Sequence, residues 1–238
     1  MAYSITGIAY LTLLFAMGYL IYRLFQYWKK EKDTASKQSL CFVSLFGLFV
    51  LIATIGGLFF ADNPLVLQKK LEVGAFIQAL AFAVMAYHII YLKFPKISPW
   101  FGFIPVLILG LIAAVLTITA IQFNPFLEPS GAINWGFPSG SITLFVSFLR
   151  LSLFLVTFIP LIIIFLLQFK NSEDPHFKGK TLGMSFALLF IVAGASLDFL
   201  LIGIFHLDPI WRDVAFIVCG AIFLITLILT LPRSPSKT

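Results

Sequence analysis

The stretch that most constrains this chain is the apolar run from Ile142 to Phe169, which holds a single cation, Arg150. A run of this length exceeds the roughly 20 residues that an α-helix needs to cross the hydrocarbon core of a bilayer. An arginine inside such a helix is unfavourable in lipid and needs a partner in the protein interior. The run therefore predicts a transmembrane helix that makes a polar contact inside a bundle.

The composition of the whole chain agrees with this interpretation. Of the 238 residues, 61% are hydrophobic and only 11% are charged, and the mean hydropathy is +1.04. Soluble domains carry about 25% charged residues, so the composition is typical of an all-α integral membrane protein. The net charge of +6 comes from Lys and Arg at the expected membrane boundaries. We therefore do not expect nucleic acid as a partner.

Charged or Pro- and Gly-containing segments separate the apolar runs. They predict a single domain, residues 1–238, built as a bundle of seven transmembrane helices. The length leaves no room for a folded soluble domain. We expect the spans at about residues 4–27, 39–60, 71–92, 102–122, 142–169, 181–205 and 214–231.

The distribution of basic residues predicts the orientation. Most of the 16 Lys and Arg residues fall at the first, third and fifth connections and in the tail, whereas Lys69, Lys70 and Arg212 fall on the other side. Cytoplasmic connections carry the excess of Lys and Arg in membrane proteins. We expect the N-terminus outside, the C-terminus in the cytoplasm, and a location in the plasma or inner cell membrane.

The partner that we expect for Arg150 is Asp198 in the sixth span. Arg150 lies about 12 Å and Asp198 about 10 Å from the same membrane boundary, at 1.5 Å per helical residue. Consecutive spans joined by a short loop are antiparallel neighbours, so the two charges can meet at one depth. The pair would either fix helix register or form a ligand-sensitive lock or anion site; a third alternative is that the two groups do not meet.

Other candidate ligand-binding residues are uncharged. Gln78 is a neutral candidate near mid-membrane, while Ser147 and Ser196 lie near the depth of the expected pair. Small hydroxylated residues in lipid serve helix packing or contact a ligand. The longest connection, residues 123–141, is either a lid over the bundle or an interfacial loop, with Trp135 among its aromatic anchors.

Known catalytic motifs are missing from the sequence. There is no Walker loop, GxSxG elbow or HExxH motif, so we expect neither an enzyme nor a resident cofactor or metal. A retinal-binding photoreceptor needs a lysine in the bundle interior for its Schiff base. Every lysine is expected in a loop or at the end of a span, which argues against that class.

Several short motifs occur in the same order as in one sensory family. They are Leu71-Glu72, Ser98-Pro99-Trp100, Asn124-Pro125, the segment GAINWG at residues 131–136, and Gly179-Lys180. With them, residues 5–230 resemble the seven-span sensory region at the N-terminus of certain bacterial and archaeal histidine kinases. The resemblance implies an input module whose last helix passes a signal to a cytoplasmic kinase, cyclase or phosphatase domain. The sequence ends at Thr238 without such a domain, so it either signals through a separate protein, or is a truncated sensor, or has another role.

These observations together predict a sensory or receptor-like membrane protein. Its expected partners are membrane lipids, a small or lipidic ligand bound within the bundle, and a cytoplasmic signalling protein. Two alternatives remain open, a small-solute transporter and an accessory membrane subunit. A transporter would use Arg150 and Asp198 for coupling, although the sequence shows no internal repeat.

Overall fold

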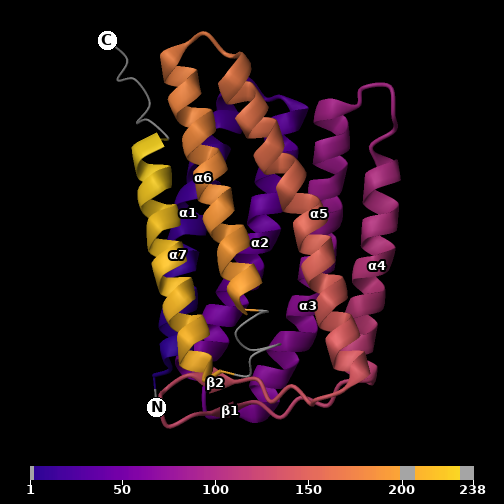
Figure 1. The fold of residues 1–238 in the computed structure, drawn as a ribbon, viewed down its shortest axis with the longest axis vertical. Coiled ribbons are helices and arrows are strands. Elements are labelled where there is room, and N and C mark those ends of the chain that lie inside the picture. The colour runs from indigo at the N-terminus through magenta and orange to yellow at the C-terminus, as the bar shows by residue number, and fades with distance from the viewer. Residues whose placement is uncertain (1–2, 199–206, 231–238) are drawn as a thin grey trace.

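The computed structural model describes residues 3–198 and 207–230. Within these residues the chain forms seven helices and one short two-stranded ribbon (Figure 1). In chain order the elements are α1 (Ile5–Glu31), α2 (Thr34–Phe59), α3 (Pro64–Lys93), α4 (Trp100–Thr119), β1 (Phe126–Leu127), β2 (Ile133–Asn134), α5 (Ser141–Asn171), α6 (Pro175–Asp198) and α7 (Pro209–Thr230).

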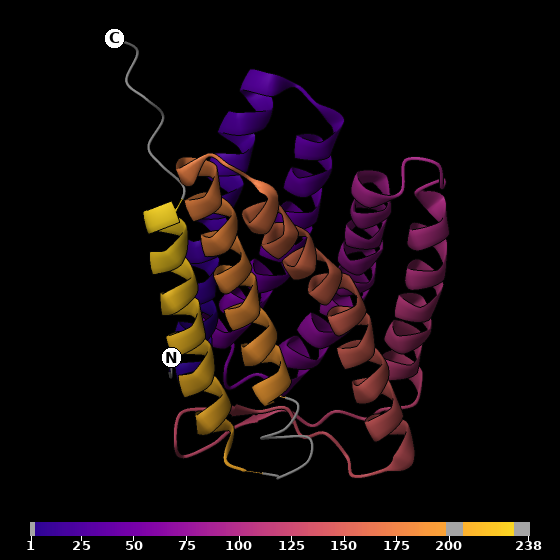
Figure 2. The ribbon, with the colours of Figure 1, turned by 45° about the horizontal axis from the view of Figure 1, so that its top comes forward.

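All seven helices are long and apolar enough to cross a membrane, which confirms the prediction of an all-α multi-pass membrane protein. Each helix packs against its sequence neighbours, and α7 returns to pack against α1 (Figure 1). One end of the bundle, here called the loop face, carries residues 60–63, 120–140 and 207–208. The opposite face carries residues 32–33, 94–99 and 172–174. Helix α5 runs obliquely, from beside α4 at the loop face to beside α6 at the opposite face (Figure 2).

Four helices begin more than one turn before the apolar runs that predicted them: α2 at Thr34, α3 at Pro64, α6 at Pro175 and α7 at Pro209. Hydropathy marks where a helix enters hydrocarbon, but a cap and a proline mark where it starts. Asn63, for example, accepts the backbone N–H of the third residue of α3 at 3.2 Å. Lys70 and Arg212, expected in connections, therefore lie inside helices. The predicted end of the sixth span, residues 199–205, lies outside the described residues.

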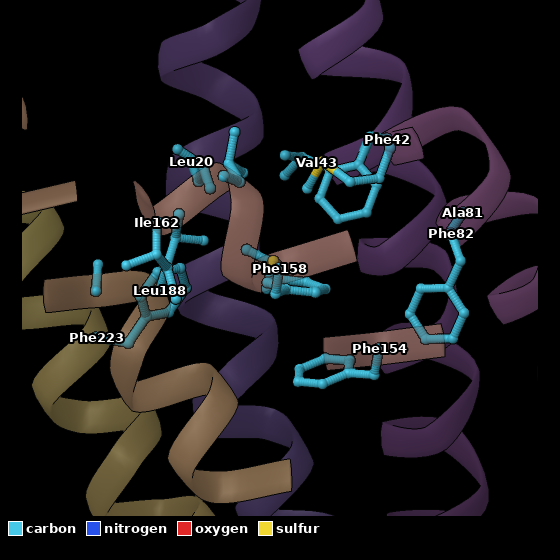
Figure 3. Close-up of a cluster of buried hydrophobic side chains, with 14 of the residues drawn as sticks. Leu20, Phe42, Val43, Ala81, Phe82, Phe154, Phe158, Ile162, Leu188 and Phe223 are labelled. Atoms are coloured by element: carbon cyan, nitrogen blue, oxygen red, sulfur yellow. The ribbon is translucent and has the colours of Figure 1, made fainter. Parts of the chain in front are cut away.

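The centre of the bundle is packed with aromatic rings from three helices (Figure 3). Phe154 and Phe158 on α5 stack with their ring centroids 4.3 Å apart. Phe42 from α2 meets Phe158 edge-on at 5.8 Å, and Phe82 from α3 meets Phe154 at 6.0 Å. Pairs of this geometry contribute beyond the area they bury. They hold α2, α3 and α5 together at mid-bundle.

Helices α1 and α2 approach closely near the loop face. A Cβ atom on Gly7 would lie 2.6 Å from the carbonyl carbon of Gly57, so neither helix tolerates a side chain here. The hydroxyl of Ser4, which caps α1, donates to the carbonyl oxygen of Gly57 at 2.6 Å. Small residues at helix contacts allow this backbone approach in membrane proteins. The contact fixes the start of α1, and with it Thr6, in the bundle interior.

Candidate functional site

Polar side chains from three helices and the longest connection gather in the interior at the loop face. We call this group the cationic cluster. It consists of Thr6 and Tyr10 on α1, Lys70 on α3, Trp135 after β2, and Arg212 and Asp213 on α7.

An ion pair at the start of α7 forms one half of the cluster. Arg212 and Asp213 are 1% and 0% exposed, and Arg212 Nε donates to Asp213 Oδ1 at 2.7 Å. The Thr6 hydroxyl donates to the other carboxylate oxygen at 2.5 Å. Arg212 Nη2 donates to the carbonyl oxygen of Ile133 at 3.0 Å. A buried pair is stable only when further hydrogen bonds satisfy its atoms, and here α1 and the ribbon supply them.

The ribbon is held against α1 by its backbone. The N–H of Ile133 donates to the Thr6 hydroxyl at 2.7 Å, and the N–H of Ile5 donates to the carbonyl of Gly131 at 2.8 Å. Gly131 turns the chain between β1 and β2 with a φ of +82°, a conformation that favours glycine. The segment GAINWG thus places a carbonyl over Arg212 and the ring of Trp135 inside the bundle.

Gly136 closes this segment at a second special position. Its φ is +58°, and a Cβ there would lie 2.2 Å from the carbonyl oxygen of Asn124. Its N–H donates to the side chain of Asn134 at 2.9 Å, and that side chain in turn donates to Glu128 at 2.9 Å. The chain can therefore turn back here only with glycine, which fixes the direction in which Trp135 points.

Lys70 forms the other half of the cluster. Its side chain is 6% exposed, and Nζ lies 3.9 Å from the ring centroid of Trp135 and 4.8 Å from that of Tyr10. Gly56 on α2 leaves room for the aliphatic stem, because a Cβ there would lie 3.2 Å from Lys70 Cδ. Among the described residues, Nζ meets no hydrogen-bond acceptor. Its neighbour Lys69, in contrast, is 74% exposed and pairs with Glu72.

The charges of the cluster do not balance among the described side chains. Two cations, Lys70 and Arg212, share one carboxylate, that of Asp213. Burying an ion costs several kcal/mol, and a desolvated cation–π contact returns about 2 kcal/mol. The remaining positive charge, facing two aromatic rings, is suited to a monovalent anion with an apolar part. This is the chemistry that the arrangement supports best.

Of the residues predicted from sequence, Trp135 lies in this cluster. It is 6% exposed and packs with Ala61, Leu67 and Ile133 at the loop-face end of the bundle. The expectation that every lysine lies in a loop or at a span end is wrong for Lys70. The argument against a retinal-binding photoreceptor assumed that no lysine lies in the bundle interior, and Lys70 does not fit that assumption.

The predicted pair of Arg150 and Asp198 is untested, because the side chain of Asp198 lies outside the described residues. Arg150 is half-buried, and its Nη2 donates to the Thr117 hydroxyl on α4 at 2.7 Å. Gln78 and Ser147 are half-buried on α3 and α5. None of these described residues belongs to the cationic cluster.

Ser196 is half-buried on α6, two residues before the described end of that helix. It is likewise outside the cationic cluster as described. Whether Ser147, Ser196 and Arg150 share a site with Asp198 therefore stays a prediction.

Sequence reasoning missed most of the cluster: Thr6, Tyr10, Lys70, Arg212 and Asp213. Two signals could have indicated it. The dipeptides Asn63-Pro64 and Asp208-Pro209 mark helix starts that place Lys70 and Arg212 inside helices. Both cations also lie on the side with few Lys and Arg, where a basic residue is least explained by orientation.

No protein-family model and no curated protein matches this sequence. The resemblance to kinase sensory regions accordingly rests on the short motifs alone. Of those motifs, GAINWG now has a structural explanation, since its glycines and Trp135 shape the cationic cluster.

Proposed function

We propose that this chain is a receptor-like membrane protein that holds a small monovalent anion with an apolar part, such as a carboxylate, at the cationic cluster. Ligand occupancy is relayed along α7 to a cytoplasmic signalling protein. The observation that carries the proposal is the buried amine of Lys70, which faces Trp135 and Tyr10 and meets no acceptor among the described residues.

Helix α7 is the element best placed to relay the change. Its first turns carry Arg212 and Asp213, and it packs mainly against α1 and α6, at the edge of the bundle (Figure 1). It then runs from the loop face to the opposite face. An anion that draws Arg212 or Lys70 toward itself changes the contacts at the start of α7, and the helix carries that displacement to its other end.

The orientation and location follow from charge. Basic residues of the described helix ends concentrate at the opposite face, including Lys29, Lys30, Lys93 and Lys170. The excess of Lys and Arg supports a cytoplasmic position for that face, in the plasma or inner cell membrane. The cationic cluster then lies on the outer side, and the end of α7 lies where a cytoplasmic partner can contact it.

The test compares two neighbouring lysines. The purified protein in neutral detergent is titrated with benzoate and, as a control of similar size, with benzyl alcohol, and the thermal unfolding midpoint is followed. We expect saturating benzoate to raise the midpoint by about 5 °C or more, the shift that corresponds to about 2–3 kcal/mol of linked binding. Lys70→Met should abolish the shift, whereas Lys69→Met should retain it.

Two results would overturn the ligand site. One is a midpoint that neither benzoate nor butyrate raises, whether or not chloride raises it. The other is a benzoate shift that Lys70→Met retains in full. Uptake of the same anion into proteoliposomes would replace the receptor by a transporter. Co-purification of a cytoplasmic protein that depends on the end of α7 would support the signalling role.

A further inference from the structure

A cleft of about 340 Å³ opens at the opposite face of the bundle, between the end of α3 and the connection from α5 to α6. Ligand sites commonly have volumes of about 300–1,000 Å³. The lining residues are Lys93, Leu167, Gln168, Asn171, Ser172 and Phe177.

The polar groups of this lining can all donate hydrogen bonds. Lys93 brings an ammonium group, Gln168 and Asn171 bring amides, and Ser172 brings a hydroxyl. No acidic residue lines the cleft among the described residues. A lysine at the end of α3 is also favoured by the helix dipole, but the dipole does not explain two amides and a hydroxyl beside it. The set matches the oxygens of a phosphate group.

The cleft lies where two of the membrane-spanning candidate helices end. Lys93 ends α3 and Asn171 ends α5, so the polar lining is where both helices leave the apolar zone. Ile163 and Leu167, one turn apart on α5, are 49% and 44% exposed. They form an apolar strip that leads from the membrane interior to the polar lining.

We propose that this cleft binds an anionic phospholipid, with its phosphate at Lys93, Gln168 and Asn171 and an acyl chain along Ile163 and Leu167. Basic pockets between transmembrane helices bind such headgroups. The site is at the other end of the bundle from the cationic cluster and does not depend on it. A lipid here joins α3 to the α5–α6 hairpin.

Binding is measured by titrating short-chain phosphatidylglycerol into the full chain in neutral detergent and counting bound lipid by native mass spectrometry. Phosphatidylcholine with the same chains and inorganic phosphate are titrated in parallel. We expect Lys93→Gln to weaken phosphatidylglycerol binding about tenfold or more, as for a lost hydrogen bond to a charged group. Lys96→Gln, three residues beyond the helix end and outside the cleft, should weaken it about fivefold or less.

Two further measurements separate a built site from general attraction. Gln168→Leu leaves every charge in place and should weaken binding about threefold. In about 0.5 M NaCl the effect of Lys96→Gln should vanish, while that of Lys93→Gln persists. Equal losses for the two lysine variants, or phosphatidylcholine bound as tightly as phosphatidylglycerol, would overturn the proposal. So would inorganic phosphate binding as tightly as the lipid, since the cleft would then be a site for a free anion.

Discussion

Two arginines inside the bundle have very different surroundings. Arg212 at the start of α7 is 1% exposed and bonds a carboxylate, a hydroxyl and a backbone carbonyl. Arg150, in the first third of the apolar run on α5, is half-buried and donates to one hydroxyl, that of Thr117. The arginine that hydropathy makes conspicuous therefore has the poorer set of described partners. Depth in an apolar run shows that a charge is unfavourable there, but not where the polar interior lies.

The side chain of Arg150 extends toward the loop face, where it finds a polar partner. Helical side chains lean toward the N-terminus of their helix, which for α5 is the loop face. Thr117 lies two residues before the loop-face end of α4. The guanidinium thus reaches from the first third of α5 toward the loop face, as long cationic side chains do in membranes.

The largest predicted effect is at Arg212. Arg212→Met leaves the Asp213 carboxylate buried without its cation, and removing one member of a buried pair costs about 3–5 kcal/mol. Arg150→Met removes one hydrogen bond from a half-buried group and should cost about 1.5 kcal/mol or less. The free energies of unfolding are compared by denaturant titration in mixed micelles.

A double variant controls for this result. Arg212→Met combined with Asp213→Leu removes both charges of the pair and should recover much of the lost stability, because no carboxylate is then buried without its arginine. If Arg212→Met proves as mild as Arg150→Met, the ion pair does not stabilise the bundle and the contrast between the two arginines fails.

The contrast also shows how far the sequence could predict this molecule. Seven apolar runs were enough for the architecture, because hydrocarbon accepts few alternatives to a helix. The cationic cluster depends instead on where helices start and on which faces meet. Ser4 reaching Gly57, and Ile133 lying over Thr6, join residues far apart in the chain. No local pattern encodes such contacts.

Trp135 also shows that the sequence indicates a segment of interest without giving its conformation. The sequence singled out its loop because the loop is long and aromatic, and it allowed either a lid or an interfacial anchor. The burial of the Trp135 ring depends on Gly131 and Gly136, whose positive φ angles turn the chain on either side of it. A GxxxxG spacing does not by itself reveal that both glycines adopt the left-handed backbone conformation.

A smaller effect tests the pair that sequence predicted. Arg150→Gln, Asp198→Asn and the double variant form a cycle whose coupling energy is zero when the two groups do not interact. We expect a coupling of about 1 kcal/mol, within the range for residues in contact. Thr117→Val, compared in the same assay, reports the part of the stability that Arg150 gains from its observed hydrogen bond.

Additive losses in this cycle would remove Asp198 as a partner. Arg150 would then be satisfied by Thr117 alone, and the difference between the two arginines would be larger still. If the coupling energy of Arg150 with Asp198 instead exceeds that of Arg212 with Asp213, Arg150 is the arginine with the stronger partner.

The smallest predicted effect concerns the carboxylate of Asp33 at the start of α2, outside the apolar part of the helix, which provides a reference for the two arginines. Asp33 caps the helix, and the hydroxyl and the backbone N–H of Ser36 both donate to its carboxylate. These hydrogen bonds, that of the hydroxyl first, lower the pKa of Asp33 below 3.8. Asp33→Ala should therefore cost about 1 kcal/mol at pH 7.

The pH dependence of this cap follows from the sign of the pKa shift. A carboxylate with a lowered pKa contributes stability that is fully present above pH 3.8 and is lost as the pH falls through the lowered value. The stability difference between the wild-type chain and Asp33→Ala should therefore shrink in acid. Asn also caps a helix but does not titrate, so Asp33→Asn should be more stable than Asp33→Ala both at pH 7 and in acid. A wild-type advantage that is equal at pH 7 and in acid would show that the carboxylate charge of Asp33 contributes nothing to the cap.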